Sequence, residues 1–443
     1  MKNRTKIRLI KNICIFFFIA TLLIGSGTMV YTYAFNPYRG SLRHHGEYRE
    51  LELSQDLDAV LTAEQAREDL AYFSKMVKSR HPMWLEENQE KTALFEERYR
   101  TVFNSIEDDM TVMELLKAAK GMAALLGDGH TLAEWRGSSL CINDLTQIEE
   151  YGMPVSINSV PTAELFNDYK TLASYEVDYY AEHLFQNAIR YEVYLRMLGI
   201  DTSEGVNMVF DTLSGVSSYH YTFVPADEVA GNVNDDEQAF VFYEIDKPNN
   251  LGIFTLKSCV NDAYYRKTLQ NFFEEVHANG ITNVAVDLRG NGGGNSSVAN
   301  EFIAYLDVDT YLSWDSDVRF GNYLLKNRNV VGKNEKKAET FGGAVYILTD
   351  ITTFSAAMDF AMLIQDNNLG EIVGEPSGNL PNSYGDLIIF QMPHSKLVFT
   401  VSYKKWYRID QTKADLPIMP DYEVPASEAL EKVYEIISND TES

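Results

Sequence analysis

The C-terminal half of the chain alternates short apolar strands with helices, and this pattern limits the fold more than any other feature. From residue 238 onward, runs rich in branched and aromatic residues are followed by segments with helical periodicity. Such alternation predicts a layered α/β core. The predicted strands cover residues 251–256, 283–288, 345–349 and 371–374, the predicted helices begin near residues 262, 297, 355 and 427, and residues 387–403 are rich in β signals.

Residues 61–138 predict a helical domain. Thr62 and Thr111 each open an apolar helical pattern, with Gln65 and Glu114 three positions later, which is the signature of a capping box. The first pattern stops at Pro82, and the last one stops at Gly127-Asp128-Gly129, where the backbone cannot continue as a helix. His130 is therefore expected on a tight loop just beyond a helix end.

Residues 139–237 predict an insert between the helical domain and the core at residues 238–443. A strand, a turn and a helix start are expected between residues 153 and 165, followed by Tyr- and Leu-rich helices up to about residue 200. Asp235-Asp236-Glu237 and the neighbouring Gly, Asn and Asp residues mark the predicted boundary with the core.

The N-terminus predicts a membrane anchor. Residues 13–34 form a run of 22 uncharged residues, which is long enough as a helix to cross a bilayer. A basic tail at residues 1–11 precedes the anchor at residues 12–34, and a polar spacer at residues 35–60 follows it. Basic flanks stay cytoplasmic, so the rest of the chain is expected outside the membrane, as a single-pass protein. The alternative is a cleaved signal peptide and a secreted protein.

Charge and composition exclude several classes of function. The formal net charge of the 443 residues is −26, which argues against binding of nucleic acid through bulk electrostatics. The 45% hydrophobic content is enough for a sizeable core. Outside the apolar run, Cys141 and Cys259 are either one disulfide or two buried thiols. No group of Cys and His residues in the sequence has the spacing of a zinc site, and neither a metal nor another cofactor is expected.

A glycine-rich loop follows the predicted strand at residues 283–288. Four glycines in the five positions 290–294 permit several backbone N–H groups to converge on an anion or an oxyanion. The loop lacks the Gly-Lys-Ser/Thr ending of a phosphate loop and the spacing of a dinucleotide fingerprint. A sharp crossover turn is the alternative interpretation.

Ser355 and His130 are candidates for nucleophilic chemistry. Ser355 lies between a buried strand and an apolar helix, where a serine commonly caps the helix. The same position places its hydroxyl beside the partial positive charge of the helix N-terminus, and the small Ala356 side chain leaves room for a substrate carbonyl. A serine needs a nearby base, usually histidine, to become nucleophilic. The two residues are 225 positions apart, so the site requires the helical domain to pack on the core.

Five motifs occur in one order along residues 60–425: LGDGHT at 126–131, VDLRGNGGG at 286–294, VYILTD-x-TTFSAA at 345–357, VGE at 373–375 and IMPD at 418–421. With these motifs the chain resembles the tail-specific (C-terminal processing) serine peptidases. It is most similar to their His-containing branch, related to the tricorn core protease and the interphotoreceptor retinoid-binding protein.

The resemblance implies an endopeptidase, or a related serine hydrolase, with a ClpP/crotonase-like core. It implies Ser355 as the nucleophile, His130 as the general base, and the amides of Ala356 and of Gly293 or Gly292 as the oxyanion hole. Asp415, with Asp410 second, is the implied carboxylate that orients the base. The loop at 376–380 contains no lysine, so a Ser–Lys dyad is not expected.

Many relatives carry a PDZ domain at the position of the insert, but the insert is too helical for a complete one. We therefore expect a degenerate PDZ-like or helical insert. Two alternatives to a peptidase remain at this stage: a catalytically silent binding protein for a peptide or an apolar ligand, and an acyl-CoA enzyme. The missing basic patch argues against the acyl-CoA enzyme. The sequence leaves the natural substrate and the oligomeric state open.

Overall fold

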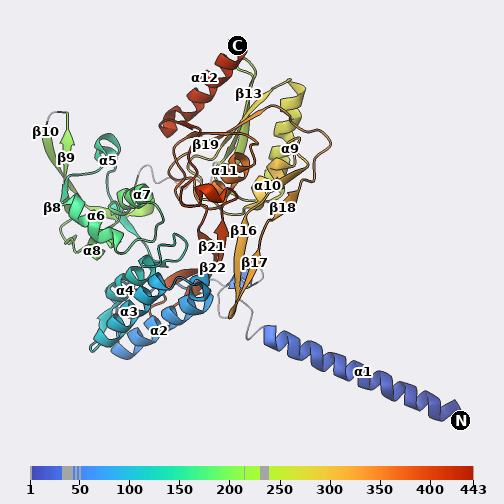
Figure 1. The fold of residues 1–443 in the computed structure, drawn as a ribbon. Coiled ribbons are helices and arrows are strands. Elements are labelled where there is room, and N and C mark those ends of the chain that lie inside the picture. The colour runs from blue at the N-terminus through green and yellow to red at the C-terminus, as the bar shows by residue number, and fades with distance from the viewer. Residues whose placement is uncertain are drawn as a thin grey trace.

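A six-stranded sheet lies at the centre of the C-terminal half in the computed structural model of the chain (Figure 1). The order is β12-β13-β14-β19-β20-β23, in which only β12 is antiparallel to its neighbour. The strands are β12 (Val241–Asp246), β13 (Leu251–Leu256), β14 (Asn283–Asp287), β19 (Ala344–Thr349), β20 (Glu371–Gly374) and β23 (Tyr422–Glu423). The structure describes residues 2–31, 43–44, 47–48, 51–213, 215–229 and 239–442.

Helices cover both faces of this sheet, because successive side chains of a buried strand point to opposite faces. On β14, Val284 and Val286 pack in the cluster that includes α9, α10 and α11, whereas Ala285 between them packs with α12. The core is therefore a three-layer α/β/α structure, as the strand–helix alternation predicts. The helices are α9 (Ala263–Ala278), α10 (Ser297–Ile303), α11 (Ala356–Asp366) and α12 (Ala429–Glu442).

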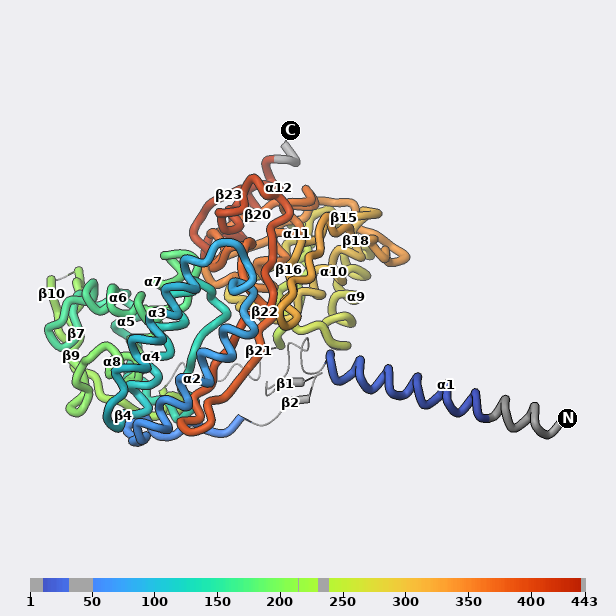
Figure 2. Tube along the Cα trace, turned by 60° about the horizontal axis from the view of Figure 1, so that its bottom comes forward, coloured from blue at the N-terminus to red at the C-terminus, as the bar shows by residue number. Residues whose placement is uncertain are grey.

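A second sheet joins the core to the helical domain. Its order is β17-β16-β22-β21, and β5 pairs with β22 at Val398 and Phe399. The hairpin of β21 and β22 lies along α2 in Figure 2, and Phe390 and Phe399 share one hydrophobic cluster with residues of α2, α3 and α4. The strands are β5 (Ala133–Glu134), β16 (Asp315–Phe320), β17 (Tyr323–Asn327), β21 (Tyr384–Gln391) and β22 (Val398–Tyr407).

Both predicted capping boxes are present at the starts of their helices. The Thr62 and Thr111 hydroxyls accept from the backbone N–H groups of Gln65 and Glu114, whose side chains accept in return. The helices are α2 (Ala63–Arg80), α3 (Glu90–Ser105) and α4 (Val112–Ala124), with the 3-10 turn η2 (Pro82–Leu85). Three further two-stranded sheets are short: β3 (Val60–Leu61) pairs with β4 (Met110–Thr111), β15 (Thr310–Leu312) with β18 (Val331–Lys333), and β1 (Arg43–His44) with β2 (Glu47–Tyr48).

The insert, described over residues 139–229 apart from residue 214, has a hydrophobic cluster of its own. Helices are present as predicted, but the hairpin of β9 and β10 was not predicted from the sequence. The strands are β6 (Leu140–Ile142), β7 (Ser156–Ile157), β8 (Val160–Pro161), β9 (Val206–Thr212), β10 (Gly215–Tyr221) and β11 (Phe223–Pro225), and the helices are α5 (Thr146–Tyr151), α6 (Thr162–Lys170), α7 (Asp178–Ala188), α8 (Glu192–Met197) and η3 (Ala226–Glu228). The predicted boundary at residues 235–237 lies outside the described residues.

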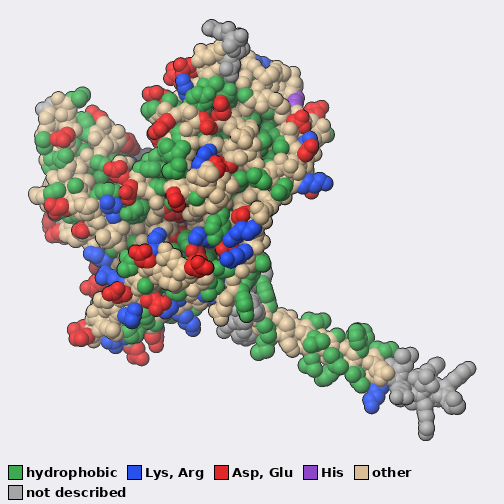
Figure 3. All heavy atoms as spheres, viewed as in Figure 1, with side chains coloured by type: hydrophobic (Ala, Val, Ile, Leu, Met, Phe, Trp, Pro, Cys, Tyr) green, Lys and Arg blue, Asp and Glu red, His purple; other side chains and the backbone are tan. Residues whose placement is uncertain are grey.

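Helix α1 (Lys2–Val30) extends away from the rest of the chain (Figure 1). Its segment Lys11–Val30 is long and apolar enough to cross a membrane, by length and composition. Figure 3 shows Asp and Glu side chains scattered over the visible face, and a notch between the insert and the core. Cys141 and Cys259 are both buried, and the disulfide considered from the sequence is not formed. Of the predicted spacer at 35–60, residues 35–42, 45–46 and 49–50 lie outside the described residues.

Candidate active site

Ser355 lies at the sharp junction between β19 and α11. Its φ of 53° and ψ of −122° cost a serine about 1–3 kcal/mol, and such strain is typical of functional turns. The side chain forms no capping hydrogen bond to α11, so the role of a simple helix cap does not apply. The backbone is fixed on both sides: Ser355 N–H donates to Asn379 Oδ1 at 2.8 Å, and Phe354 N–H donates to the Asn291 carbonyl at 3.0 Å. The turn therefore presents the hydroxyl away from the helix.

His130 meets Ser355 from the helical domain. Its Nε2 lies 3.0 Å from Ser355 Oγ, within hydrogen-bond distance. The loop is held from two directions, because the Thr400 hydroxyl donates to the His130 carbonyl at 2.6 Å and the following segment enters the second sheet as β5. The Phe354 ring lies beside the imidazole, with ring centroids 5.1 Å apart. The sequence predicts that the helical domain packs on the core at this point, and it does.

Burial lowers the pKa of His130, and the nearby carboxylates of Asp128 and Asp386 and the backbone of Tyr384 oppose this shift only in part. The imidazole is therefore neutral at neutral pH and can accept a proton. Its Nδ1 is buried without a hydrogen-bond partner among the described residues, and it lies 3.9 Å from Asp128 Oδ1.

Asp128 is a buried carboxylate that the sequence interpretation did not assign. Its Oδ1 accepts the backbone N–H of His130 at 2.9 Å, and its Oδ2 accepts the Ser402 hydroxyl at 2.7 Å and lies 3.1 Å from His81 Nε2. His81 Nδ1 accepts the Met83 N–H at 3.2 Å, so its ring proton is on Nε2 and points at Asp128. The LGDGHT motif at 126–131 could have indicated this residue, because Asp128 lies two residues before His130 in it.

Asp128 is the ionised member of this group. Burial by itself would raise the pKa of Asp128, but the hydrogen bond from His81, the positive charges that His81 and His130 carry when protonated in acid, and the Thr131 hydroxyl outweigh it and hold the pKa well below its usual value. A fixed negative charge therefore lies beside the Nδ1 side of the His130 ring.

The glycine loop packs directly against the serine turn. A Cβ atom on Gly293 would lie 2.8 Å from Ser355 Cβ and 2.9 Å from Ala356 N, so only glycine fits this position. However, the Gly293 N–H donates to Asn291 Oδ1 at 2.8 Å and is not free. Gly292 is exposed, and the Ala356 N–H opens α11, where no acceptor within the helix is available.

Glu176 connects the insert to both loops. Its Oε1 accepts the Gly129 N–H at 3.3 Å, and its Oε2 accepts the Leu380 N–H at 2.9 Å. Burial and the charge of Asp128 raise the pKa of Glu176 to about 8, although the two amides oppose the shift. Among the described residues, the side chains of Asp128, His130 and Glu176 alone bring ligand atoms close enough for a metal ion, within 4.8 Å of one another. No sequence motif indicates Glu176, because it lies in the insert.

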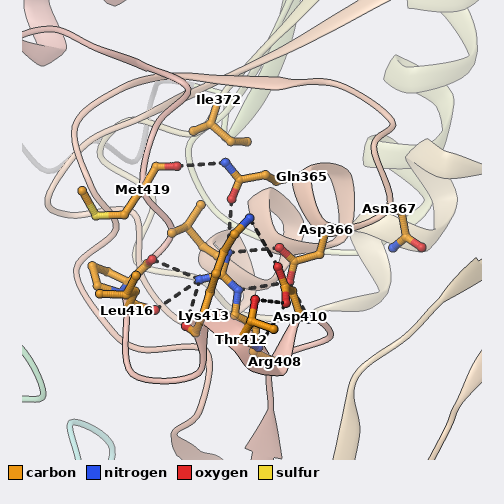
Figure 4. A network of polar contacts seen from close by, with 12 residues as sticks. Gln365, Asp366, Asn367, Ile372, Arg408, Asp410, Thr412, Lys413, Leu416 and Met419 are labelled. Atoms are coloured by element: carbon orange, nitrogen blue, oxygen red, sulfur yellow. Dashed lines mark hydrogen bonds and ion pairs between the residues drawn. The ribbon is translucent and has the colours of Figure 1, made fainter.

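Asp415 forms no hydrogen bond or ion pair with His130. It is exposed, and the carboxylates that act on His130 are Asp128 and Asp386. The reason is the buried Arg408, which anchors the loop around Asp415 by donating to the carbonyls of Lys413, Leu416 and Pro417 (Figure 4).

The same arginine forms an ion pair with Asp366 at 3.0 Å, with both side chains almost fully buried. Asp410, the second candidate for the orienting carboxylate, belongs to this network as well, because its N–H donates to Asp366 Oδ2. The Arg408 network therefore fixes the C-terminal motif to the end of α11 rather than to the histidine.

A narrow cavity of about 30 Å³ opens beside Ser355, with room for about two water molecules. Two carboxylates, Asp359 and Asp386, line it. Burial and the charge of Asp386 raise the pKa of Asp359 to about 7. A peptide therefore needs the walls of this cavity to move apart.

Comparison with known proteins agrees with this geometry. The model of Peptidase family S41 matches residues 250–424, which include the glycine loop and Ser355. Mature CPAF has the same fold, with a TM-score of 0.60 at 10% sequence identity over 85% of this chain and 96% of that chain. CPAF complexed with lactacystin gives a TM-score of 0.54 at 10% identity, over 85% and 97%. The photosystem II D1 C-terminal processing protease is a weaker structural match, with a TM-score of 0.48 at 14% identity over 84% and 97%.

The family match defines the class of protein: the chain is a serine-type peptidase. Within this class it resembles the tail-specific peptidases of family S41, so the recognition made from the five sequence motifs is confirmed.

Proposed function

We propose that the chain is a membrane-anchored, extracytoplasmic serine endopeptidase in which Ser355 is the nucleophile and His130 is the general base. The observation that supports this proposal most directly is the 3.0 Å separation of His130 Nε2 and Ser355 Oγ, two atoms from residues 225 positions apart. A helix cap or a structural histidine does not require this contact.

In the proposed reaction, His130 Nε2 takes the Ser355 proton while Oγ attacks the peptide carbonyl. The resulting tetrahedral oxyanion is stabilised by backbone N–H groups, and His130 then gives its proton to the leaving amine. A water molecule, deprotonated by the same imidazole, hydrolyses the acyl-enzyme and restores the serine. The lowered pKa of His130 favours the first step, because the base must start neutral.

We assign the orienting role to Asp128 rather than to Asp415. A neutral His130 that accepts at Nε2 carries its proton on Nδ1, and Asp128 Oδ1 is 3.9 Å from that nitrogen. This separation is longer than a hydrogen bond, and such contacts commonly shorten when substrate binds. The three hydrogen-bonded neighbours of Asp128 hold its charge in place for the imidazolium that forms.

For the oxyanion hole we propose the amides of Ala356 and Gly292, with Gly293 contributing only after its N–H leaves Asn291 Oδ1. This exchange needs a small rotation within a loop whose glycines permit it. The ClpP/crotonase-like description of the core and the PDZ-like origin of the insert belong to the same proposal, supported by the layered sheet and the position of the insert.

The proposed location rests on α1 and its flanking bases. A helix of this length and hydropathy is an anchor or a signal sequence, and the basic residues before it favour a cytoplasmic N-terminus. Extraction of cell membranes with alkaline carbonate tests this: an anchored chain stays in the pellet, whereas a cleaved one is soluble and begins near residue 35.

Labelling with a fluorophosphonate probe tests the active site. We expect the unmodified chain to be labelled at Ser355, Ser355→Ala to lose labelling and peptide hydrolysis, and His130→Ala to lower both by about 10³-fold or more. Ser296→Ala is the matched control, since Ser296 lines the same cavity and makes no side-chain capping bond. An unlabelled but folded chain would instead indicate the catalytically silent binding protein.

A further inference from the structure

A second cavity, separate from the Ser355 site, lies where the insert meets the helical domain. Its volume is about 320 Å³, and it is lined by α4, by β5 and the segment that follows it, and by α8. In Figure 1 and Figure 2, α8 lies next to α4 at this junction. The lining residues are Leu116, Lys120, Ala133, Glu134, Trp135, Ser139, Tyr191, Val193, Tyr194 and Met197. A volume in this range holds a small organic molecule.

Lys120 is the unusual member of this lining. Its ammonium donates to the Ala133 carbonyl at 3.3 Å and lies 5.6 Å from the centre of the Tyr194 ring, but it forms no ion pair with any described residue. Burial lowers the pKa of Lys120, and the nearby Glu134 charge opposes this only in part. A part-buried ammonium without a counter-ion is costly, and an anion that enters the cavity removes that cost.

Three aromatic side chains, Trp135, Tyr191 and Tyr194, also line the cavity, and Trp135 is held in place. The Trp135 indole N–H donates to the Gln55 carbonyl at 2.8 Å, and Gly137 leaves the space that the Trp135 ring occupies, since a Cβ there would lie 2.1 Å from the ring. Aromatic side chains together with one positive group suit a ligand with a flat apolar body and one negative end.

We propose that this cavity binds a small monocarboxylate with an aromatic body, whose carboxylate pairs with Lys120 and whose ring lies against Trp135, Tyr191 and Tyr194. Glu134 lines the same cavity and disfavours a second negative charge. The ligand is therefore a monoanion rather than a dicarboxylate or a phosphate ester. The site is independent of the serine chemistry, since none of its lining residues takes part in the Ser355 cavity.

The test uses the full chain in detergent and three compounds of one shape: 3-phenylpropionate, its amide and 3-phenylpropylamine. Isothermal titration and the thermal midpoint are measured for each. We expect saturable binding of the acid with a Kd on the order of a millimolar or tighter, as for a ligand of about a dozen atoms, and at least about tenfold weaker binding of the amide and the amine. Equal binding of the acid and the amide, or no binding of the acid, would overturn the proposal.

Two variants separate the roles of the charges. Lys120→Met, which keeps the length of the side chain, is expected to weaken binding of the acid by about tenfold or more while leaving the ligand-free thermal midpoint unchanged or higher. Glu134→Gln is expected to strengthen binding a few-fold, because it removes a like charge. Stronger binding to Lys120→Met, or weaker binding to Glu134→Gln, contradicts the proposed pairing. Fluorophosphonate labelling of each variant reports separately on the Ser355 site.

Discussion

Replacement of Glu176 by glutamine should change how the stability of the fold depends on pH. The pKa of Glu176 is raised from 4.5 to about 8 in the folded chain, chiefly by burial. Because the folded state binds this proton more tightly than the unfolded state, Glu176 contributes stability that is full below about pH 4.5 and is lost as the pH rises to about 8. The shift of about 3.5 units corresponds to at most about 5 kcal/mol, at about 1.4 kcal/mol per pH unit.

The assay is thermal unfolding of the full chain in detergent between pH 5 and pH 8.5. Glutamine is uncharged throughout, so Glu176→Gln is expected to unfold at increasingly higher temperature than the unmodified chain as the pH rises above 5. Glutamine has one acceptor oxygen fewer for the Gly129 or Leu380 N–H. This loss lowers the free energy of unfolding by about 1 kcal/mol at every pH, but it does not change how that free energy depends on pH. Glu182→Gln, an exposed change in the same insert, is the control and should give a curve parallel to that of the unmodified chain. If the Glu176→Gln curve is parallel as well, Glu176 is ionised in the fold and the reasoning is wrong.

Three further predictions concern the site and its support. Asp128→Asn should lower the rate of fluorophosphonate labelling at Ser355 by about 10²–10⁴-fold, because the amide no longer stabilises the imidazolium; labelling kinetics on a variant with unchanged circular dichroism check this. Arg408→Met should destabilise the fold by about 3–5 kcal/mol by leaving Asp366 charged and unpaired, and the double change with Asp366→Leu should recover most of the loss in denaturant titrations. Ser355→Gly should unfold at a higher denaturant concentration than Ser355→Ala, by about 1 kcal/mol, because glycine adopts the positive φ without strain.

The strands, helices and the loops of Ser355 and His130 could be predicted because their signals are local. The capping boxes at Thr62 and Thr111, the apolar strand runs and the glycine turns each determine the backbone within a few residues. The hairpin of β9 and β10 was missed although its sequence contains a signal: Val206, Met208 and Phe210 alternate with other residues along β9, and Gly205 and Gly215 flank this strand. These three side chains are buried in the cluster of the insert.

The partners of the site residues depend on contacts between distant segments, which no local pattern contains. Asp415 is close to the C-terminal motif in sequence, but three carbonyls bound to Arg408 hold its loop elsewhere. Asp128 is held by His81, 47 residues earlier, and by Ser402, 274 residues later. The Gly293 amide is likewise occupied by a side chain, Asn291, whose orientation depends on its further bond to the Leu256 carbonyl.

The insert contributes to the site through a short segment that contains Glu176, just before α7, and Tyr180, within α7. Glu176 binds the loop before His130 and the loop that carries Asn379, which in turn accepts the Ser355 N–H. Nearby, the Tyr180 ring stacks on Phe354 with centroids 5.0 Å apart, and Phe354 lies against His130. The insert therefore acts on Ser355 through the loop of Asn379, and on His130 through the Phe354 ring. A rotation of the insert relative to the core would break the Glu176 bonds and the ring stack together, so the geometry at Ser355 depends on a part of the chain that supplies no reacting atom.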